Sequence, residues 1–163
     1  MIMKTKPIKR NENIMKLSKE HHFSLLFCWK IRQGLKCETT TERIIKYVQY
    51  FREHHLDAHF REEEKILFSP LKDEWVKKAI EDHKQIKNLL NELPGSTEDN
   101  TEKRLMRLAN LVDDHVRYEE RKLFPHLEKT LSKEQLEKIG KRLDAQQPSP
   151  LTDDFEDQFW MKK

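Results

Sequence analysis

HFREEEKILF (residues 59–68) returns later in the chain as HVRYEERKLF (residues 115–124). In both segments a His is followed four residues later by a Glu, a second Glu comes next, and Leu-Phe closes the pattern. Because residues four apart lie on one face of a helix, each segment can present one imidazole and one carboxylate to the same point. Such a pair is half of a metal site. The two pairs are His59 with Glu63 and His115 with Glu119.

The composition favours long helices joined by short connections. The chain has 163 residues, a length typical of one domain with its own core. Only three Gly and six Pro occur, whereas Lys, Glu, Leu and Arg are abundant. We therefore expect an all-α protein.

Charge and hydropathy argue against two classes of partner. The 32 Lys and Arg residues and the 29 Asp and Glu residues are interleaved, and a net charge of +3 is too small and too dispersed to predict nucleic-acid binding. No apolar run approaches the roughly 20 residues that span a bilayer, and the N-terminus lacks the apolar stretch of a signal peptide. We therefore expect no membrane partner and a cytoplasmic location. Cys28 and Cys37 form neither a CxxC pair nor a disulfide framework, which indicates reduced thiols.

Apolar spacing predicts the first two helices. Steps of three and four residues indicate a first helix from about residue 14 or 18 to about residue 35, with Gly34 marking its end. A second helix is expected to begin near the capping box Thr39-x-x-Glu42 and to run about 28 residues to Phe68. This second helix contains the first His/Glu pair.

Two further helices complete the predicted bundle. Asp73 is expected to cap a third helix that stops at the Pro-Gly pair at 94–95. After a polar linker over residues 96–100, a fourth helix is expected over about residues 101–124 or a little past Pro125. The fourth helix contains the second His/Glu pair.

We expect three parts along the chain. They are a polar, basic arm over residues 1–13, a four-helix bundle over residues 14–130, and a short fifth helix with a tail over residues 131–163. The box Ser132-x-x-Gln135 predicts the start of the short helix. The aromatic residues expected to dock the tail onto the bundle are Phe155, Phe159 and Trp160.

The predicted topology brings the scattered ligands to one depth. Four helices with short connections are expected to form an antiparallel, up-down-up-down bundle. There, both His/Glu pairs lie level with two further histidines on apolar helix faces, His21 and His83. Helix axes about 8 to 10 Å apart leave room for two carboxylate-bridged ions roughly 3.5 to 4 Å from each other. The six candidate ligands are His21, His59, Glu63, His83, His115 and Glu119.

Simpler interpretations are satisfied core histidines and solvated ion pairs. However, four imidazoles beside two buried carboxylates would carry a heavy desolvation cost without a metal, so the repeated pairs favour a metal site. His22 remains an alternative to His21, although its face would turn Trp29 inward where the face of His21 turns Ile31 inward. The histidines left open between surface, core and supporting roles are His22, His54, His55 and His126.

The chain resembles the hemerythrin-like (HHE cation-binding) family over about residues 14–130, in the order of Glu20-His21, His83 and the two His-x-x-x-Glu pairs with their Leu-Phe endings. The resemblance implies a four-helix bundle around a non-haem di-iron centre, with Glu63 and Glu119 bridging the irons and the histidines in terminal positions. Imidazole and carboxylate donors without thiolate suit iron or manganese better than a closed structural zinc site. We expect two iron ions, with manganese less favoured.

Lys87 marks a departure from that family. Oxygen-carrying hemerythrins have a second His four residues after the third-helix ligand, and Lys87 stands there in this chain. One donor fewer implies more open coordination positions, so we expect binding or sensing of a small diatomic ligand, O₂ or NO, rather than oxygen transport. The alternative is an enzyme that turns over peroxide or NO at the same site, or a protein of iron handling or repair. Lys87 itself is expected to extend outward or pair with a carboxylate, and Tyr118 to pack as a half-buried phenol.

Overall fold

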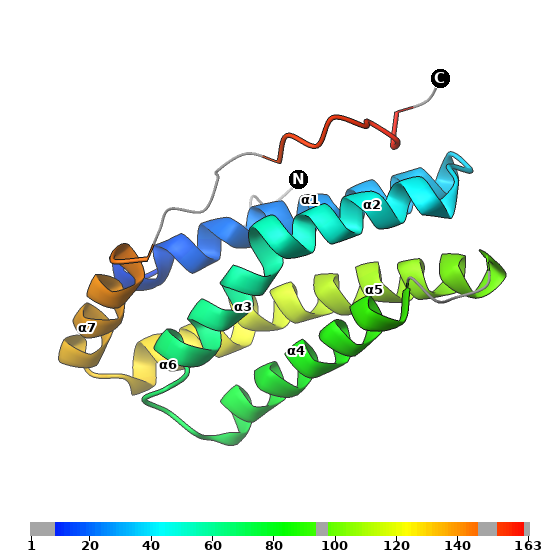
Figure 1. Ribbon diagram of the computed structural model, residues 1–163. Helices are drawn as coiled ribbons and strands as arrows, with labels where there is room; N and C mark the ends of the chain where they lie inside the picture. Colours follow the sequence, from blue (N-terminus) through cyan, green and yellow to red (C-terminus); the bar gives the residue numbers. More distant parts are fainter. Residues whose placement is uncertain (1–8, 94–97, 147–152, 162–163) are drawn as a thin grey trace, which may run out of the picture.

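Four helical runs form the body of the molecule and lie side by side, and the chain reverses direction from each run to the next (Figure 1). The computed structural model describes residues 9–93, 98–146 and 153–161, and within those ranges there is no β-strand. The prediction of an all-α helical bundle is confirmed.

The runs differ in regularity. The first is α1 (Met15–Lys36), which follows a 3₁₀ turn, η1 (Glu12–Ile14). The second joins α2 (Thr41–Phe51), the π-helical turn η2 (Arg52–Leu56), α3 (Asp57–Glu62) and the π-helical turn η3 (Glu63–Leu67). The third is α4 (Glu74–Glu92), and the fourth joins α5 (Glu98–Tyr118), the π-helical turn η5 (Glu119–Leu123) and α6 (Phe124–Thr130). A separate helix, α7 (Lys133–Asp144), contacts η1 and η3 at one end of the bundle (Figure 1).

Two predicted helix starts are confirmed. The carboxylate of Asp73 accepts a hydrogen bond from the N–H of Val76 at 3.0 Å and caps α4. Ser132 and Gln135 form the predicted capping box at the start of α7. Several predicted features lie outside the described residues. They are residues 1–8 of the arm, the Pro-Gly pair at 94–95, residues 96–97 of the linker, and residues 147–152 and 162–163 of the tail.

Two other boundaries fall within two residues of the prediction, but the roles assigned to the residues that mark them are wrong. Thr39 forms no capping box, because its hydroxyl donates to the carbonyl of Phe159 at 2.8 Å, and Thr40 is the N-cap residue of α2. Gly34 does not end α1, which continues to Lys36. A Cβ at Gly34 would lie 2.6 Å from Cε2 of Phe159, so the glycine leaves room for that ring. Both residues serve the docking of the C-terminal segment rather than the ends of helices.

The C-terminal segment 153–161 lies along α1 and α2, as predicted from its aromatic residues (Figure 1). Phe159 is buried, and its ring centroid lies 5.4 Å from that of Tyr47. Asp153 pairs with the buried Nζ of Lys30 at 3.1 Å, and this ammonium also lies 4.0 Å from the ring centroid of Trp160. Apolar burial and a neutralised buried charge together hold the segment on the bundle.

Two apolar clusters fill the bundle, one on each side of a polar layer. In every run the candidate ligands fall between residues of the two clusters along the chain: His21 on α1, for example, lies between Leu17 of one cluster and Phe27 of the other. In the fourth run, Glu119 lies between Val116 and Leu123 in the same way. The polar layer is therefore enclosed by packed side chains above and below.

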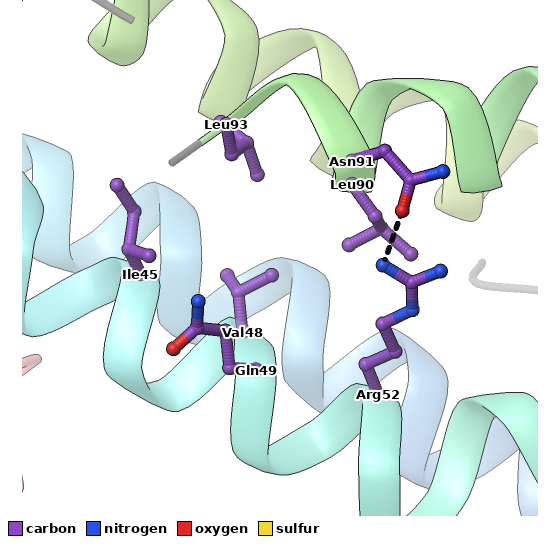
Figure 2. Close-up of a pocket in the computed structure, with 7 residues that line it drawn as sticks. All are labelled: Ile45, Val48, Gln49, Arg52, Leu90, Asn91 and Leu93. Atoms are coloured by element: carbon purple, nitrogen blue, oxygen red, sulfur yellow. Dashed lines mark hydrogen bonds between the residues drawn. The ribbon is translucent and has the colours of Figure 1, made fainter. Parts of the chain in front are cut away.

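A small pocket of about 150 Å³ opens between α2 and the C-terminal end of α4, away from the polar layer (Figure 2). Val48 and Leu90 form part of its apolar wall, and Nη1 of Arg52 donates to Oδ1 of Asn91 at 2.8 Å on its rim. No candidate ligand lines this pocket. Among the described residues, no helix combines the length and the apolarity needed to cross a membrane.

Candidate metal centre

The six candidate ligands come from all four runs and meet inside the polar layer. The imidazoles belong to α1, α3, α4 and α5, and each of the two carboxylates is the first residue of a π-helical turn. Exposed fractions range from 0% for Glu63 and Glu119 to 4% for His59. The structure thus brings together all six candidate ligands that the sequence predicts. That these residues bind a metal stays a prediction of the sequence.

Their donor atoms fall into two overlapping groups. Within each group, one donor atom per residue lies within 4.8 Å of every other. One group is His21, His59, Glu63 and Glu119, and the other is His83, His115, Glu63 and Glu119. Because both carboxylates belong to both groups, the arrangement offers two candidate cation positions that share two carboxylates.

Each carboxylate contacts one imidazole of its own run and one or two imidazoles of other runs. Oε1 of Glu63 lies 3.3 Å from Nε2 of His59 and 3.1 Å from Nε2 of His83. The matching contacts of the other carboxylate, both 3.0 Å long, join Oε1 of Glu119 to Nε2 of His115 and Nε2 of His21. A fifth contact joins Oε2 of Glu63 to Nε2 of His21 at 3.7 Å. The i, i+4 spacing therefore gives two of the five contacts, and the packing of the runs gives the other three.

A π-helical turn begins at each carboxylate. The N–H of Phe68 donates to the carbonyl of Glu63 at 2.8 Å, and the N–H of Phe124 donates to the carbonyl of Glu119. Each of these hydrogen bonds spans five residues, and its donor is the Phe of the repeated Leu-Phe pair. The sequence pattern predicted regular helix here and missed both turns.

The fourth run also continues well past Pro125, to Thr130.

Every candidate histidine also has a carboxylate near its other ring nitrogen, Nδ1. Such a carboxylate fixes the orientation of a ring and leaves Nε2 to face the ion. The four contacts are His59 with Glu20 at 2.9 Å, His83 with Glu64 at 2.8 Å, His115 with Asp82 at 3.2 Å and His21 with Glu120 at 3.2 Å. We call these four acids the outer carboxylates.

The repeated His/Glu pattern gives the outer carboxylates no role, although the sequence contains a signal for them. Each is the immediate sequence neighbour of a candidate ligand, as Asp82 is of His83. Adjacent residues on a helix point about 100° apart, so an acid next to a ligand reaches the neighbouring run rather than its own ligand. Asp82 accordingly contacts His115 on α5.

Charge inside the layer is balanced between imidazoles and carboxylates. Burial lowers the pKa of His59, but the nearby charge of Glu63 and the hydrogen bond with Glu20 outweigh it and raise that pKa to about 10. The same competition raises the pKa of His115 to about 9, chiefly through Glu119 and Asp82. Burial raises the pKa of Glu63, but the surrounding imidazoles outweigh it and hold that pKa well below its usual range. Positive charge nearby therefore stabilises the buried carboxylates, and either protons on the imidazoles or a bound cation can supply it.

Unpaired donor atoms show that the residues present fit a metal. Both carboxylate oxygens of Glu63, Oε2 of Glu119 and Nε2 of His59 are buried and form no hydrogen bond within the described structure. Leaving such atoms unpaired is costly, and a carboxylate costs more than a neutral group. All of them belong to the two overlapping groups, so cations at those positions would satisfy them together.

The remaining sequence predictions around the site resolve clearly. His21 is buried and His22 exposed, so the rival to His21 is excluded from the layer. Nζ of Lys87 lies 3.6 Å from Oε2 of Glu64 with the side chain 40% exposed, which confirms the predicted pairing. Tyr118 is half-buried as predicted, and its hydroxyl donates to the carbonyl of Trp75 at 2.7 Å.

The other three histidines serve packing or the surface. His54 is exposed. His55 is buried against Phe51 with ring centroids 5.0 Å apart, and burial lowers its pKa. His126 is half-buried, and its Nε2 lies 2.6 Å from Oδ2 of Asp73.

Comparison with known proteins agrees with this geometry. The family model described as Hemerythrin HHE cation binding domain matches residues 14–127. The matched region contains all six candidate ligands and all four outer carboxylates. Searches of curated proteins and of solved structures gave no match.

Proposed function

Because the chain belongs to the hemerythrin HHE cation-binding family, we propose that it holds two non-haem iron ions that bind a small diatomic ligand, O₂ or NO. The observation that carries the proposal is the sharing of Glu63 and Glu119 by the two ligand groups. Six residues are too many for one ion unless several stay unused, whereas two ions bridged by both carboxylates use them all.

The donor set supports iron. Four imidazoles and two carboxylates without a thiolate suit iron or manganese, and they differ from the sulfur-rich set of a closed structural zinc site. When bound, a ferrous pair would supply the electrons and the metal coordination that O₂ or NO requires. This chain's own residues orient the imidazoles through the outer carboxylates and exclude water through the two apolar clusters.

Lys87 supports ligand binding rather than a filled coordination sphere. Its ammonium is drawn outward to Glu64 and is 40% exposed, so it does not take the place of a ligand beside His83. A neutral imidazole at that position could donate to a metal, whereas an ammonium cannot. The half of the centre near His83 therefore keeps room for an exogenous ligand.

Anaerobic titration of the ferrous protein tests this function. We expect stoichiometric spectral changes with NO and O₂, and loss of these changes in Glu63→Ala protein. Steady-state consumption of H₂O₂ or NO is measured on the same samples. Turnover that continues long after the sites are saturated would replace the binding function by the enzymatic alternative. Absence of any spectral response in iron-loaded protein would exclude both.

A further inference from the structure

We propose that Arg10 is a positioning residue for the His21/His59 half of the centre and that it makes the two cation positions inequivalent. The proposal rests on the two-ion function above. Arg10 lies outside residues 14–127, so the family match does not include it. Its side chain is only 2% exposed, which is unusual for an arginine in a segment that precedes the bundle.

The guanidinium of Arg10 is held by two hydrogen bonds, one from each Nη atom, which we call the fork. Nη1 donates to Oε1 of Glu128 at 2.7 Å, and Nη2 donates to the backbone carbonyl of Glu120 at 2.7 Å. Its Cζ lies 5.5 Å from the ring centroid of Phe124, and that ring stacks on His21 with centroids 5.2 Å apart. Arg10 therefore reaches the neighbourhood of His21 by two routes, through Glu120 and through the ring of Phe124.

Pro125 explains why the fork ends on the carbonyl of Glu120. In η5 the N–H of Phe124 donates to the carbonyl of Glu119, so the next carbonyl, that of Glu120, would pair with the N–H of residue 125. Residue 125 is proline and has no N–H. Arg10 supplies the missing donor and so stabilises the π-helical turn that presents Glu119.

The side chain of Glu120 continues the path to the metal centre. Its Oε2 lies 3.2 Å from Nδ1 of His21 and 3.8 Å from Nη2 of Arg10, and its Oε1 accepts from the hydroxyl of Ser18 at 2.6 Å. Arg10 thus constrains both the backbone and the carboxylate of Glu120, and that carboxylate orients His21.

The other half of the centre has a weaker counterpart. Glu64 follows Glu63 as Glu120 follows Glu119, and its neighbouring cation is Lys87, 3.6 Å away and 40% exposed. An exposed ammonium is solvent-screened and flexible, whereas a buried guanidinium with two hydrogen bonds is fixed. The His21/His59 position should therefore hold its ion more firmly than the His83/His115 position.

Co²⁺ titration in two half-site backgrounds tests the proposal. His83→Ala/His115→Ala protein keeps the first half, and His21→Ala/His59→Ala protein keeps the second. Arg10→Met should raise the Kd for Co²⁺ about 10-fold in the first background and leave it unchanged in the second. Arg10→Lys should behave like Arg10→Met, because one ammonium nitrogen does not reproduce the two separate nitrogens with which the planar guanidinium bonds Glu120 and Glu128. Arg32→Met is the matched control, because Arg32 bonds Asp113 and Asn110 across α1 and α5.

The other outcomes overturn the proposal. Equal weakening in both backgrounds would show that Arg10 acts on the whole fold, and no weakening in either would show that it does not act on the centre. Recovery of the Co²⁺ affinity with Arg10→Lys would show that Arg10 acts through its charge and not through its two hydrogen bonds. The ion count of the unmodified protein separates these results from failure of the two-ion function, since fewer than two Co²⁺ ions there would contradict that function itself.

Discussion

At the residue scale, the candidate centre depends on histidine rings that face a carboxylate at each ring nitrogen. Nε2 of each ring lies in the shared layer and Nδ1 faces an outer carboxylate, as in His115, which lies between Glu119 and Asp82. This arrangement sets which nitrogen can face an ion. It also makes four acids outside the ligand set part of the centre's chemistry.

Asp82→Asn tests the role of an outer carboxylate. The amide keeps the shape of the side chain but loses the charge that holds Nδ1 of His115, so metal affinity should fall about 10- to 100-fold. Competition with a chelator measures this change. Glu81→Gln is the control, because Glu81 is the exposed neighbour on the same helix. Equal affinity in the Asp82→Asn and unmodified proteins would remove the outer carboxylates from the account.

The two cysteines should differ in reactivity. Burial and, to a lesser extent, the nearby charge of Asp113 raise the pKa of the Cys28 thiol to about 12. Because the thiolate is the reactive form, Cys28 should stay unmodified by a disulfide reagent at neutral pH, while the half-buried Cys37 reacts. Urea should expose the second thiol. Rapid modification of both thiols in folded protein would show that α1 opens more readily than its packing indicates.

At the element scale, the C-terminal segment is packed as part of the bundle. Phe159 occupies a space that exists because residue 34 has no side chain, and its carbonyl accepts from Thr39. A glycine inside a helix normally weakens that helix by about 1 kcal/mol relative to alanine. Here the packing of Phe159 offsets that loss.

A double-mutant cycle at Gly34 and Phe159 tests this packing. In the unmodified protein, Gly34→Ala forces a methyl against the ring of Phe159 and should destabilise the fold by about 1–3 kcal/mol. In a Phe159→Ala background the clash with the ring is gone, and the remaining close neighbour is Cδ1 of Ile44, the end of a flexible side chain 3.2 Å away. The same substitution should then stabilise α1 by up to about 1 kcal/mol. Urea unfolding of the metal-free proteins measures both values. The same sign in both backgrounds would contradict the proposed contact.

Much of the element structure follows from local sequence, and the exceptions have physical reasons. Asp73 and Ser132 cap helices because their partners lie three residues away. Thr39 and Gly34 were misinterpreted because the partner of both is Phe159, which lies 120 residues beyond Thr39. The π-helical turns were missed because apolar periodicity barely changes across one five-residue turn.

The candidate site was predictable to the same extent. The repeat and the matching depths indicated all six ligands, and those residues do meet. The choice between His21 and His22 needed the packing of α1 against its neighbours, which buries the first ring and exposes the second. The roles of the outer carboxylates could be predicted only with knowledge of the neighbouring run, because each carboxylate contacts a histidine across a helix interface rather than along its own helix.

At the scale of the whole molecule, the centre joins all four runs between two apolar clusters. Two fully buried carboxylates, Glu63 and Glu119, lie in the middle of this packing. Cations at that point would connect every run to the others, so metal binding and stability should be coupled.

Loading with metal should therefore raise the unfolding temperature. A ligand present at 1,000 times its Kd stabilises the folded state by about 4 kcal/mol, which for a chain of this size corresponds to a shift on the order of 10 °C. Calorimetry of metal-free and loaded protein measures the shift. The control is Glu63→Ala protein, which should gain much less. Equal unfolding temperatures with and without metal would show that the runs do not depend on the centre.

Iron content of the reconstituted protein tests the two-ion centre most directly. About two iron equivalents per chain are expected, because six ligands with two shared carboxylates exceed what one ion uses. Glu63→Ala and Glu119→Ala should each lower that content. A single tightly bound ion that neither substitution affects would contradict the account.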